Sequence, residues 1–228
     1  TDEIAAEMCE RYGLNNAAAA VITNGVPDYK RSGSAGSHSR PRVVYLCGSL
    51  DAPWHGIDRL LAIANADHSV EFVLVGGTGA DDLHDERFGY VPPNVSFMGP
   101  LFGNELDAVL QSCDVGIGTL ALERKEMEEA CSLKVREYVA NGLPLYLPHK
   151  DADFSEQLWF VCYRPSGQNA DAAFHAQEIK AFAMAVRGKF VTPADLRGTF
   201  FVDKERDRIA LMEAARARRT RLLFDIGS

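Results

Sequence analysis

From Pro41 onward, the chain alternates short, nearly continuous apolar runs with segments whose apolar residues recur at helical spacing. The apolar runs predict strands over 42–48, 70–77, 94–99, 114–120 and 143–148. The periodic segments predict helices over 56–67, 103–113 and 132–142. Strands without polar alternation are buried on both faces, which predicts a mostly parallel sheet covered by helices. With right-handed crossovers, the expected fold class is α/β, a doubly wound Rossmann-like domain with a helical C-terminal tail.

The two ends of the chain follow other patterns. Residues 2–13 predict a helix that stops at Gly13, and residues 19–26 predict a short strand that ends in an Asn-Gly turn. Residues 30–40 are basic and rich in Ser and Gly, which predicts a flexible loop. After residue 150 the pattern weakens, and we expect a strand and two helices within 156–164, 170–187 and 203–223.

These patterns divide the chain into three expected units. Residues 1–40 form an interdomain helix, a short strand and a flexible loop. Residues 41–200 form the ligand-binding α/β domain, and residues 201–228 form the C-terminal helix. The chain lacks an initiator Met, so we expect it to be a piece of a longer protein.

Composition excludes several classes of protein. The 228 residues are 46 % hydrophobic and carry a net charge of −8, whereas a nucleic-acid-binding protein would be basic. No apolar run reaches membrane-spanning length, and the acidic N-terminus has no signal-peptide layout. The five cysteines contain no CxxC pair, and the histidines show no metal-ligand spacing. We therefore expect a cytoplasmic protein without a metal site.

A ligand is expected at the carboxyl ends of the parallel strands, because ligands of open α/β sheets bind there. These ends are Cys47-Gly48-Ser49, Val75-Gly76-Gly77, Phe97-Met98-Gly99 and Gly118-Thr119-Leu120. The loop before Ser132 follows the last of these strands, so the helix that Ser132 opens begins at the same edge of the sheet.

The start of that helix predicts an anion site. Ser132 is a suitable N-cap whose hydroxyl can accept a first-turn N–H, and Leu133, Lys134 and Val135 would present free N–H groups. The Lys134 ammonium adds a full positive charge to the helix dipole. A diphosphate fits such a site.

Two carboxylates flank the predicted anion site. Glu137 lies inside the helix, where its acceptor oxygens suit a ribose diol, and Glu129 precedes the helix, where a sugar attached to the diphosphate would lie. A second interpretation stays open, since the chain is rich in Glu. Glu128 and Glu129 would then belong to a solvated loop, and Glu137 to an exposed helix face or to an ion pair with Lys134.

The stretch "EACSLKVREYVANGLP" resembles the signature of the C-terminal domain of GT-B-fold retaining glycosyltransferases of family four, the glycosyl transferases group 1. The matching residues are Glu129, Glu137, Ala140, Gly142 and Pro144. Further segments resemble this family in the same order, among them "VITNGV", "VVYLCGSLDAPWHGIDRLL", "VEFVLVGG" and "NVSFMG". The resemblance runs from about residue 1 to about residue 150.

The resemblance implies a donor-binding domain that takes a nucleotide-diphosphate sugar for metal-independent hexosyl transfer with retention, without a cofactor. It implies catalytic roles for Glu129 and Lys134. It implies substrate binding by Glu137, Ser132, Leu133, Gly48, Ser49, His55, Met98 and Leu101, with Met98 and Leu101 at the base. The acceptor domain would precede Thr1, so we expect this half to be inactive alone. Many family members use lipid-linked acceptors, which allows peripheral contact with the cytoplasmic membrane face.

Two departures from the family pattern keep an alternative function open. Ser49 and His55 stand where the family commonly has an Arg and a Lys that hold the diphosphate. The alternative is a non-catalytic module of the same fold that has lost tight donor binding and binds a nucleotide or another partner.

Overall fold

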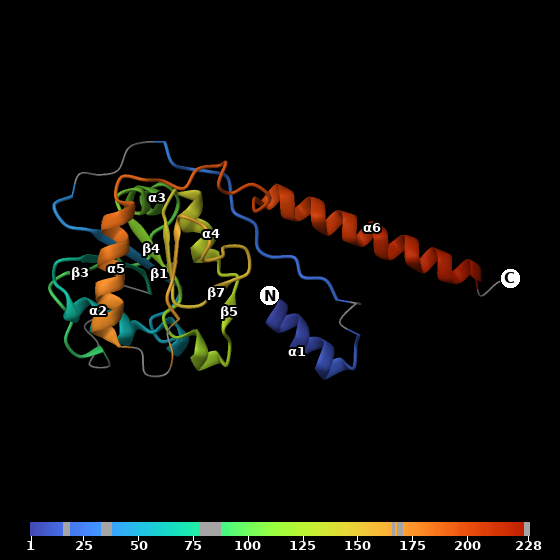
Figure 1. Cartoon of the computed structure of the whole chain (residues 1–228), viewed down its shortest axis with the longest axis horizontal. Coiled ribbons are helices and arrows are strands. Elements are labelled where there is room, and N and C mark those ends of the chain that lie inside the picture. Colours follow the sequence, from blue (N-terminus) through green and yellow to red (C-terminus); the bar gives the residue numbers. More distant parts are fainter. Residues whose placement is uncertain (16–18, 33–37, 78–87, 166, 168–170, 226–228) are drawn as a thin grey trace.

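The structure is a computed structural model that describes residues 1–15, 19–32, 38–77, 88–165, 167 and 171–225. Its centre is a parallel sheet of six strands in the order β3-β2-β1-β4-β6-β8 (Figure 1). The strands are β1 (Arg42–Cys47), β2 (Glu71–Gly76), β3 (Val95–Phe97), β4 (Val115–Ile117), β6 (Leu145–Leu147) and β8 (Val161–Tyr163). From β1 the strands are added first toward one edge of the sheet, through β2 to β3, and then toward the other edge, from β4 to β8. This change between β1 and β4 is typical of doubly wound folds. The predicted fold class is confirmed.

Helices cover both faces of this sheet (Figure 1). On one face, α2 (Ile57–Ala66) packs against α5 (Ala172–Val186), and their apolar residues share a core with Tyr45 and Phe72. On the other face, α3 (Gly103–Gln111) and α4 (Leu133–Ala140) pack over a second core that includes Val44 and Val73. Successive residues of β1 thus enter opposite cores, which explains why its sequence reads as one continuous apolar run.

Close packing fixes α4 on the sheet. The Tyr138 ring lies on Gly116 of β4, where an added Cβ would come within 2.4 Å of the ring. The Tyr138 hydroxyl accepts the N–H of Leu46 at 2.7 Å. Both contacts are buried at the carboxyl ends of β1 and β4. They hold the start of α4 at the edge of the sheet where a ligand was predicted.

Four short elements that the sequence did not predict, two strands and two 3-10 helices, lie at the same edge of the sheet. β5 (Glu129–Ala130) pairs in parallel with β7 (Lys150–Asp151) in a small second sheet. The 3-10 helices η2 (Pro53–His55) and η5 (Leu122–Lys125) follow β1 and β4. They contact each other and bring two loops of the ligand edge together.

The N-terminal predictions have mixed outcomes. α1 (Asp2–Tyr12) is a helix that ends at Gly13 in the left-handed conformation, as predicted. The strand predicted over 19–26 is wrong, because Val26 forms only an isolated bridge with Phe200. Within the predicted loop 30–40, residues 33–37 lie outside the described residues.

The start of that predicted loop is anchored. Lys30 forms ion pairs with Asp107 and Glu137, and the Arg31 guanidinium lies 3.5 Å from the centre of the Phe190 ring. The prediction of a flexible loop is therefore wrong for these two residues, because their cations find acidic and aromatic partners far away in the sequence.

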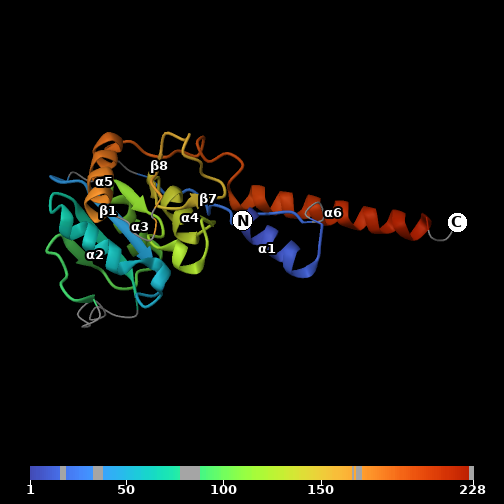
Figure 2. The same ribbon diagram turned by 60° about the horizontal axis from the view of Figure 1, so that its bottom comes forward.

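The C-terminal helix, α6 (Phe201–Asp225), projects away from the sheet in both ribbon views (Figures 1 and 2). Its first turn is attached to the rest of the chain, since the Lys204 ammonium contacts the Asp153 carboxylate at 2.8 Å. The strand and the helices predicted after residue 150 correspond to β8, α5 and α6. Within the described ranges, no helix combines the length and the apolarity that a membrane span requires.

Candidate functional site

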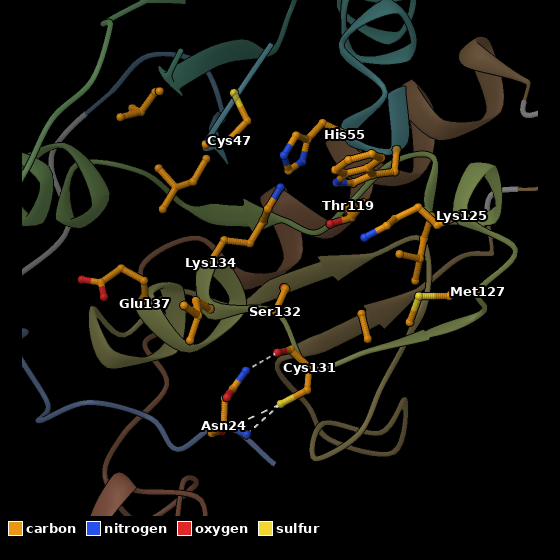
Figure 3. Close-up of a pocket in the computed structure, with 18 of the residues that line it drawn as sticks. Asn24, Cys47, His55, Thr119, Lys125, Met127, Cys131, Ser132, Lys134 and Glu137 are labelled. Carbon is orange, nitrogen blue, oxygen red and sulfur yellow. Dashed lines mark hydrogen bonds between the residues drawn. The ribbon is translucent and has the colours of Figure 1, made fainter. Parts of the chain in front are cut away.

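A cavity of about 1050 Å³ opens at the carboxyl edge of the sheet (Figure 3). The ends of β1 and β2, the first turn of α4, the 3-10 helices η2 and η5, and residues 22–24 line this cavity. The predicted ligand edge and the cavity therefore coincide. Of the predicted site residues, seven line it: Gly48, His55, Leu101, Ser132, Leu133, Lys134 and Glu137.

The first turn of α4 is open toward the cavity. No described protein group accepts the N–H groups of Leu133, Lys134 or Val135. The predicted capping hydrogen bond of Ser132 is wrong, because the Ser132 hydroxyl is buried without a partner among the described residues. β5 pairs with β7 up to Ala130, so that pairing sets the entry of the chain into α4 without a side-chain cap. Free amides and an unused hydroxyl remain available to a ligand.

Lys134 places an unpaired cation in the same turn. Its Nζ is buried without a hydrogen-bond partner among the described residues and lies 4.0 Å from the centre of the Tyr45 ring. Loss of hydration lowers the pKa of Lys134 to about 7. In Figure 3 the side chain extends toward His55. A buried ammonium without a counter-charge indicates that the site binds an anion.

His55 faces Lys134 from η2. Its Nδ1 is buried without a partner in the described part of the chain. Burial, and then the charges of Lys134 and Lys125, lower the pKa of His55 to about 4. The ring is therefore neutral at pH 7 and can donate one hydrogen bond to an anion, but it brings no positive charge.

Glu137 lines the other end of the cavity. One oxygen of its carboxylate forms an ion pair with Lys30, whose Nζ also lies 3.1 Å from Asp107. Figure 3 shows the carboxylate directed away from Lys134. The interpretation of Glu137 as a partner of Lys134 is therefore wrong, and its second oxygen is the acceptor left for a ligand.

Glu129 does not line the cavity. Its carboxylate accepts the N–H of Glu3 at 3.4 Å, and its own N–H donates to the Glu3 carboxylate at 3.0 Å. Glu3 lies in the first turn of α1, where the helix dipole attracts an anion. In this arrangement α1 holds the carboxylate that the sequence analysis assigned to sugar hydroxyls.

Two further predicted residues also lie outside the cavity lining. The Ser49 hydroxyl accepts the N–H of Asp51 at 3.2 Å, which turns it back onto its own loop. Met98 follows β3, and 42 % of its surface is exposed. Leu101, its neighbour in the predicted base site, does line the cavity.

The structure adds lining residues that the sequence analysis did not select. Lys125 and Thr119 approach from the loop after β4, and the Lys125 Nζ lies 4.3 Å from the centre of the Trp54 ring. Asn24 closes the wall beside Cys131, where its side-chain amide donates to the Cys131 carbonyl at 2.7 Å (Figure 3). Their position in the sequence could have identified them, since Thr119 and Lys125 follow a strand whose end lies at the ligand edge.

Arg136 connects the segments that lie behind the cavity. Its guanidinium is 1 % exposed, and its two Nη atoms bind the carboxylates of Asp151 and Asp153. Its Nε donates to the Asn24 carbonyl at 3.2 Å. The buried guanidinium of α4 thus joins two carboxylates at and after β7 to the backbone at Asn24. In the described ranges, no cluster of His, Cys, Asp and Glu has the makings of a metal site.

The sequence of this region also matches a known family. Residues 41–146 match the family Glycosyl transferases group 1. The matched stretch runs from β1 into β6 and includes Lys134 and Glu137. The predicted resemblance is confirmed over these residues. Among curated proteins, none matches the chain.

Solved structures show the same fold. The apo form of the lipopolysaccharide outer core galactosyltransferase WaaB has a TM-score of 0.63 at 10 % identity, covering 92 % of this chain and 59 % of WaaB. HepE from Anabaena in complex with UDP-glucose has a TM-score of 0.59 at 16 % identity, covering 90 % of this chain and 60 % of HepE. S. aureus TarM in a complex that contains UDP has a TM-score of 0.57 at 16 % identity, covering 86 % of this chain and 38 % of TarM. The chain therefore has the α/β fold of GT-B glycosyltransferases and spans less than two thirds of each relative.

Proposed function

We propose that this chain is the donor-binding part of a retaining glycosyltransferase, which binds a nucleotide-diphosphate sugar and takes part in hexosyl transfer without a metal ion. The observation that carries the proposal is the buried, unpartnered Nζ of Lys134 beside the free amides that open α4. The family match over residues 41–146 supports the same assignment. In this proposal the acceptor domain belongs to another part of the full protein, and the donor-binding domain is inactive alone.

The proposal arranges the parts of the donor along the cavity. The diphosphate contacts the amides of Leu133 and Lys134, the Lys134 ammonium and the Ser132 hydroxyl. The ribose lies at the free oxygen of Glu137, with the base near Leu101. The sugar then occupies the opposite end of the cavity. The glycine at position 48 supports this order, because an added Cβ there would meet no protein atom within 4 Å and that space is left to a ligand.

The proposed transfer breaks the bond between the anomeric carbon and the diphosphate oxygen, which leaves with the electron pair. The acceptor oxygen forms the new bond to the anomeric carbon on the same face, and its proton passes to the leaving diphosphate oxygen. Negative charge grows on the diphosphate as the sugar becomes oxocarbenium-like. Lys134 and the amides of α4 stabilise that charge in a preorganised site, which replaces the role of a metal ion.

Nucleotide binding tests the proposal. We expect calorimetric titration of the whole chain with UDP, GDP and ADP to show binding of at least one nucleotide, with UDP as the first candidate because HepE and TarM are described with UDP. Failure of all three to bind would contradict the proposal and favour the alternative, a non-catalytic module. Two features favour that alternative: Ser49 does not line the cavity, and His55 is neutral.

The two flanking glutamates are expected to differ. Glu137→Gln should weaken UDP binding by about tenfold, since the amide accepts poorly from a ribose diol and loses its ion pair with Lys30. Glu129→Gln should leave the UDP affinity unchanged, because Glu129 lies outside the cavity lining. Glu129 reaches a sugar only if its hydrogen bond with Glu3 opens, so its effect should appear only with the complete nucleotide sugar. Equal losses of UDP affinity in both variants would contradict the assignment.

The proposed setting is the cytoplasm, and contact with a membrane through a lipid-linked acceptor stays a prediction. Neither changes the chemistry of the donor site.

A further inference from the structure

The charges that line the cavity are distributed unevenly. Among the described lining residues, Glu137 carries the only carboxylate, and it lies at the proposed ribose end. Lys134 and His55 occupy the middle, and Lys125 lies on the side away from Glu137 (Figure 3). The proposed sugar end therefore has a positive charge and no described carboxylate.

The ammonium of Lys125 is available to a ligand. Within the described part of the chain it has no ion pair, and it lies against the face of the Trp54 ring, 4.3 Å from the centre. Among the acidic side chains nearby, Glu123 pairs with Arg59 and Asp58 pairs with Arg124, and Glu126, the next residue, does not line the cavity. The ring holds the Lys125 ammonium beside the cavity and, being neutral, brings no counter-charge.

The field of Lys125 reaches the interior of the cavity. The charges of Lys134 and Lys125 both contribute to the low pKa of His55, after burial. Figure 3 shows the Lys125 Nζ directed toward the interior, on the side of Thr119. A ligand that spans the cavity from Glu137 past Lys134 therefore ends beside this ammonium.

A neutral hexose finds few acceptors at this end. Its hydroxyls are usually held by carboxylates, and Glu129, the carboxylate assigned to them from the sequence, is hydrogen-bonded to Glu3 of α1. Thr119 offers one hydroxyl, whereas Met127 and Leu122 are apolar. A carboxylate on the sugar itself would instead supply the counter-charge that Lys125 lacks.

We propose that the sugar subsite takes an acidic sugar, a hexuronic acid, whose carboxylate is bound by the Lys125 ammonium beside Trp54. This inference rests on the proposed function, because it takes the position of the sugar from the diphosphate site at α4. Lys125 is then a residue that determines donor specificity and plays no part in holding the nucleotide.

A pair of donors that differ only at C6 tests the inference. The whole chain is titrated calorimetrically with UDP, UDP-glucose and UDP-glucuronate, or with GDP, GDP-mannose and GDP-mannuronate if GDP is the nucleotide that binds best. We expect the hexuronate donor to bind about five- to tenfold more tightly than the hexose donor. Lys125→Met should reduce that ratio to about one and leave the affinity for the free nucleoside diphosphate unchanged, whereas Lys125→Arg should keep the preference.

Lys189→Met is the matched control, since Lys189 is exposed and does not line the cavity; it should change none of the affinities. Binding of the nucleoside diphosphate with equal affinity for hexose and hexuronate would overturn this inference and leave the proposed function standing. A preference that persists in Lys125→Met would overturn the role of Lys125. Absence of any nucleotide binding would overturn both proposals.

Discussion

Lys134→Met is expected to lower the affinity of the chain for UDP by at least about a hundredfold. Among the described residues, Lys134 has the only buried ammonium that lines the cavity, so its removal leaves the α4 amides alone to face a diphosphate. Methionine has a similar length and no charge, so the packing against Tyr45 is kept. Isothermal titration calorimetry of both proteins with UDP measures the change.

The same substitution is expected to stabilise the protein without a ligand. The ammonium is buried without a counter-charge, so the free energy of unfolding should rise by about 1 to 3 kcal/mol in Lys134→Met near pH 6. The sign follows from the pKa of Lys134, which is lowered to about 7 in the folded chain from its ordinary value of 10.5. Between these two values the unfolded chain binds more protons, so the wild type becomes more stable as pH rises and the advantage of Lys134→Met shrinks.

Urea denaturation at several pH values tests this stability effect. Lys180→Met is the control, because Lys180 pairs with Asp67 on the surface of α5, away from the cavity. A Lys134→Met protein that binds UDP as well as the wild type does, or that is less stable than the wild type near pH 6, would contradict the role given to Lys134.

Arg136→Ala is expected to destabilise the chain by about 3 to 5 kcal/mol. The side chains of Asp151 and Asp153 are 0 % and 10 % exposed, and removal of the guanidinium leaves two buried carboxylates near each other. The Asn24 carbonyl also loses its hydrogen bond, and the Phe154 ring loses a cation 5.0 Å from its centre. Thermal or urea denaturation measures the loss.

Two further variants separate the buried network from ordinary surface ion pairs. Arg164→Ala removes a cation that is 43 % exposed and paired with Glu178, and should cost less than about 1 kcal/mol. Adding Asp151→Asn to Arg136→Ala should recover part of the lost stability, because it removes one unpaired buried charge. Equal effects of Arg136→Ala and Arg164→Ala would show that the buried network contributes no more than a surface pair.

The sheet and the place of the site were predictable because they depend on local patterns. Continuous apolar runs such as Val43–Leu46 report burial on both faces of a strand, and residues at the carboxyl ends of such strands lie together in this topology. Lys134 and Glu137 line the cavity for that reason. The family match over residues 41–146 includes the same stretch.

The parts that were not predictable depend on partners far away in the sequence. Glu129 is turned to Glu3, which is 126 residues away, and the sequence analysis treated α1 as a separate element. Lys30 finds Glu137 across 107 residues, so a stretch that reads as a flexible linker is anchored. Val26 pairs with Phe200 only through an isolated bridge, so the apolar residues near it form no strand. Spacing along the chain carries no signal for such pairings.

The charge at the proposed sugar end of the cavity is a further case. In the sequence, Lys125 is one cation in a polar loop. In the structure, the contact of η2 with η5 places it over Trp54. The sequence showed that a cation follows β4, but the direction of its side chain depends on how two loops pack.

The central claim is that a diphosphate occupies the α4 site and is held there by the charged form of Lys134. The pH dependence of UDP-glucose binding tests it most directly, because this diphosphate is esterified at both ends and does not itself titrate in the measured range. His55 and Cys47 both stay neutral in that range, since burial lowers the pKa of His55 to about 4 and raises that of Cys47 to about 11.

Calorimetric titrations from about pH 6 to about pH 9 should show constant affinity below pH 7 and, above it, a fall that approaches tenfold per pH unit, with uptake of up to about one proton on binding. Lys134→Met should bind weakly at every pH with no such slope. An affinity of the wild type that does not change with pH, or the same slope in Lys134→Met, would contradict the account.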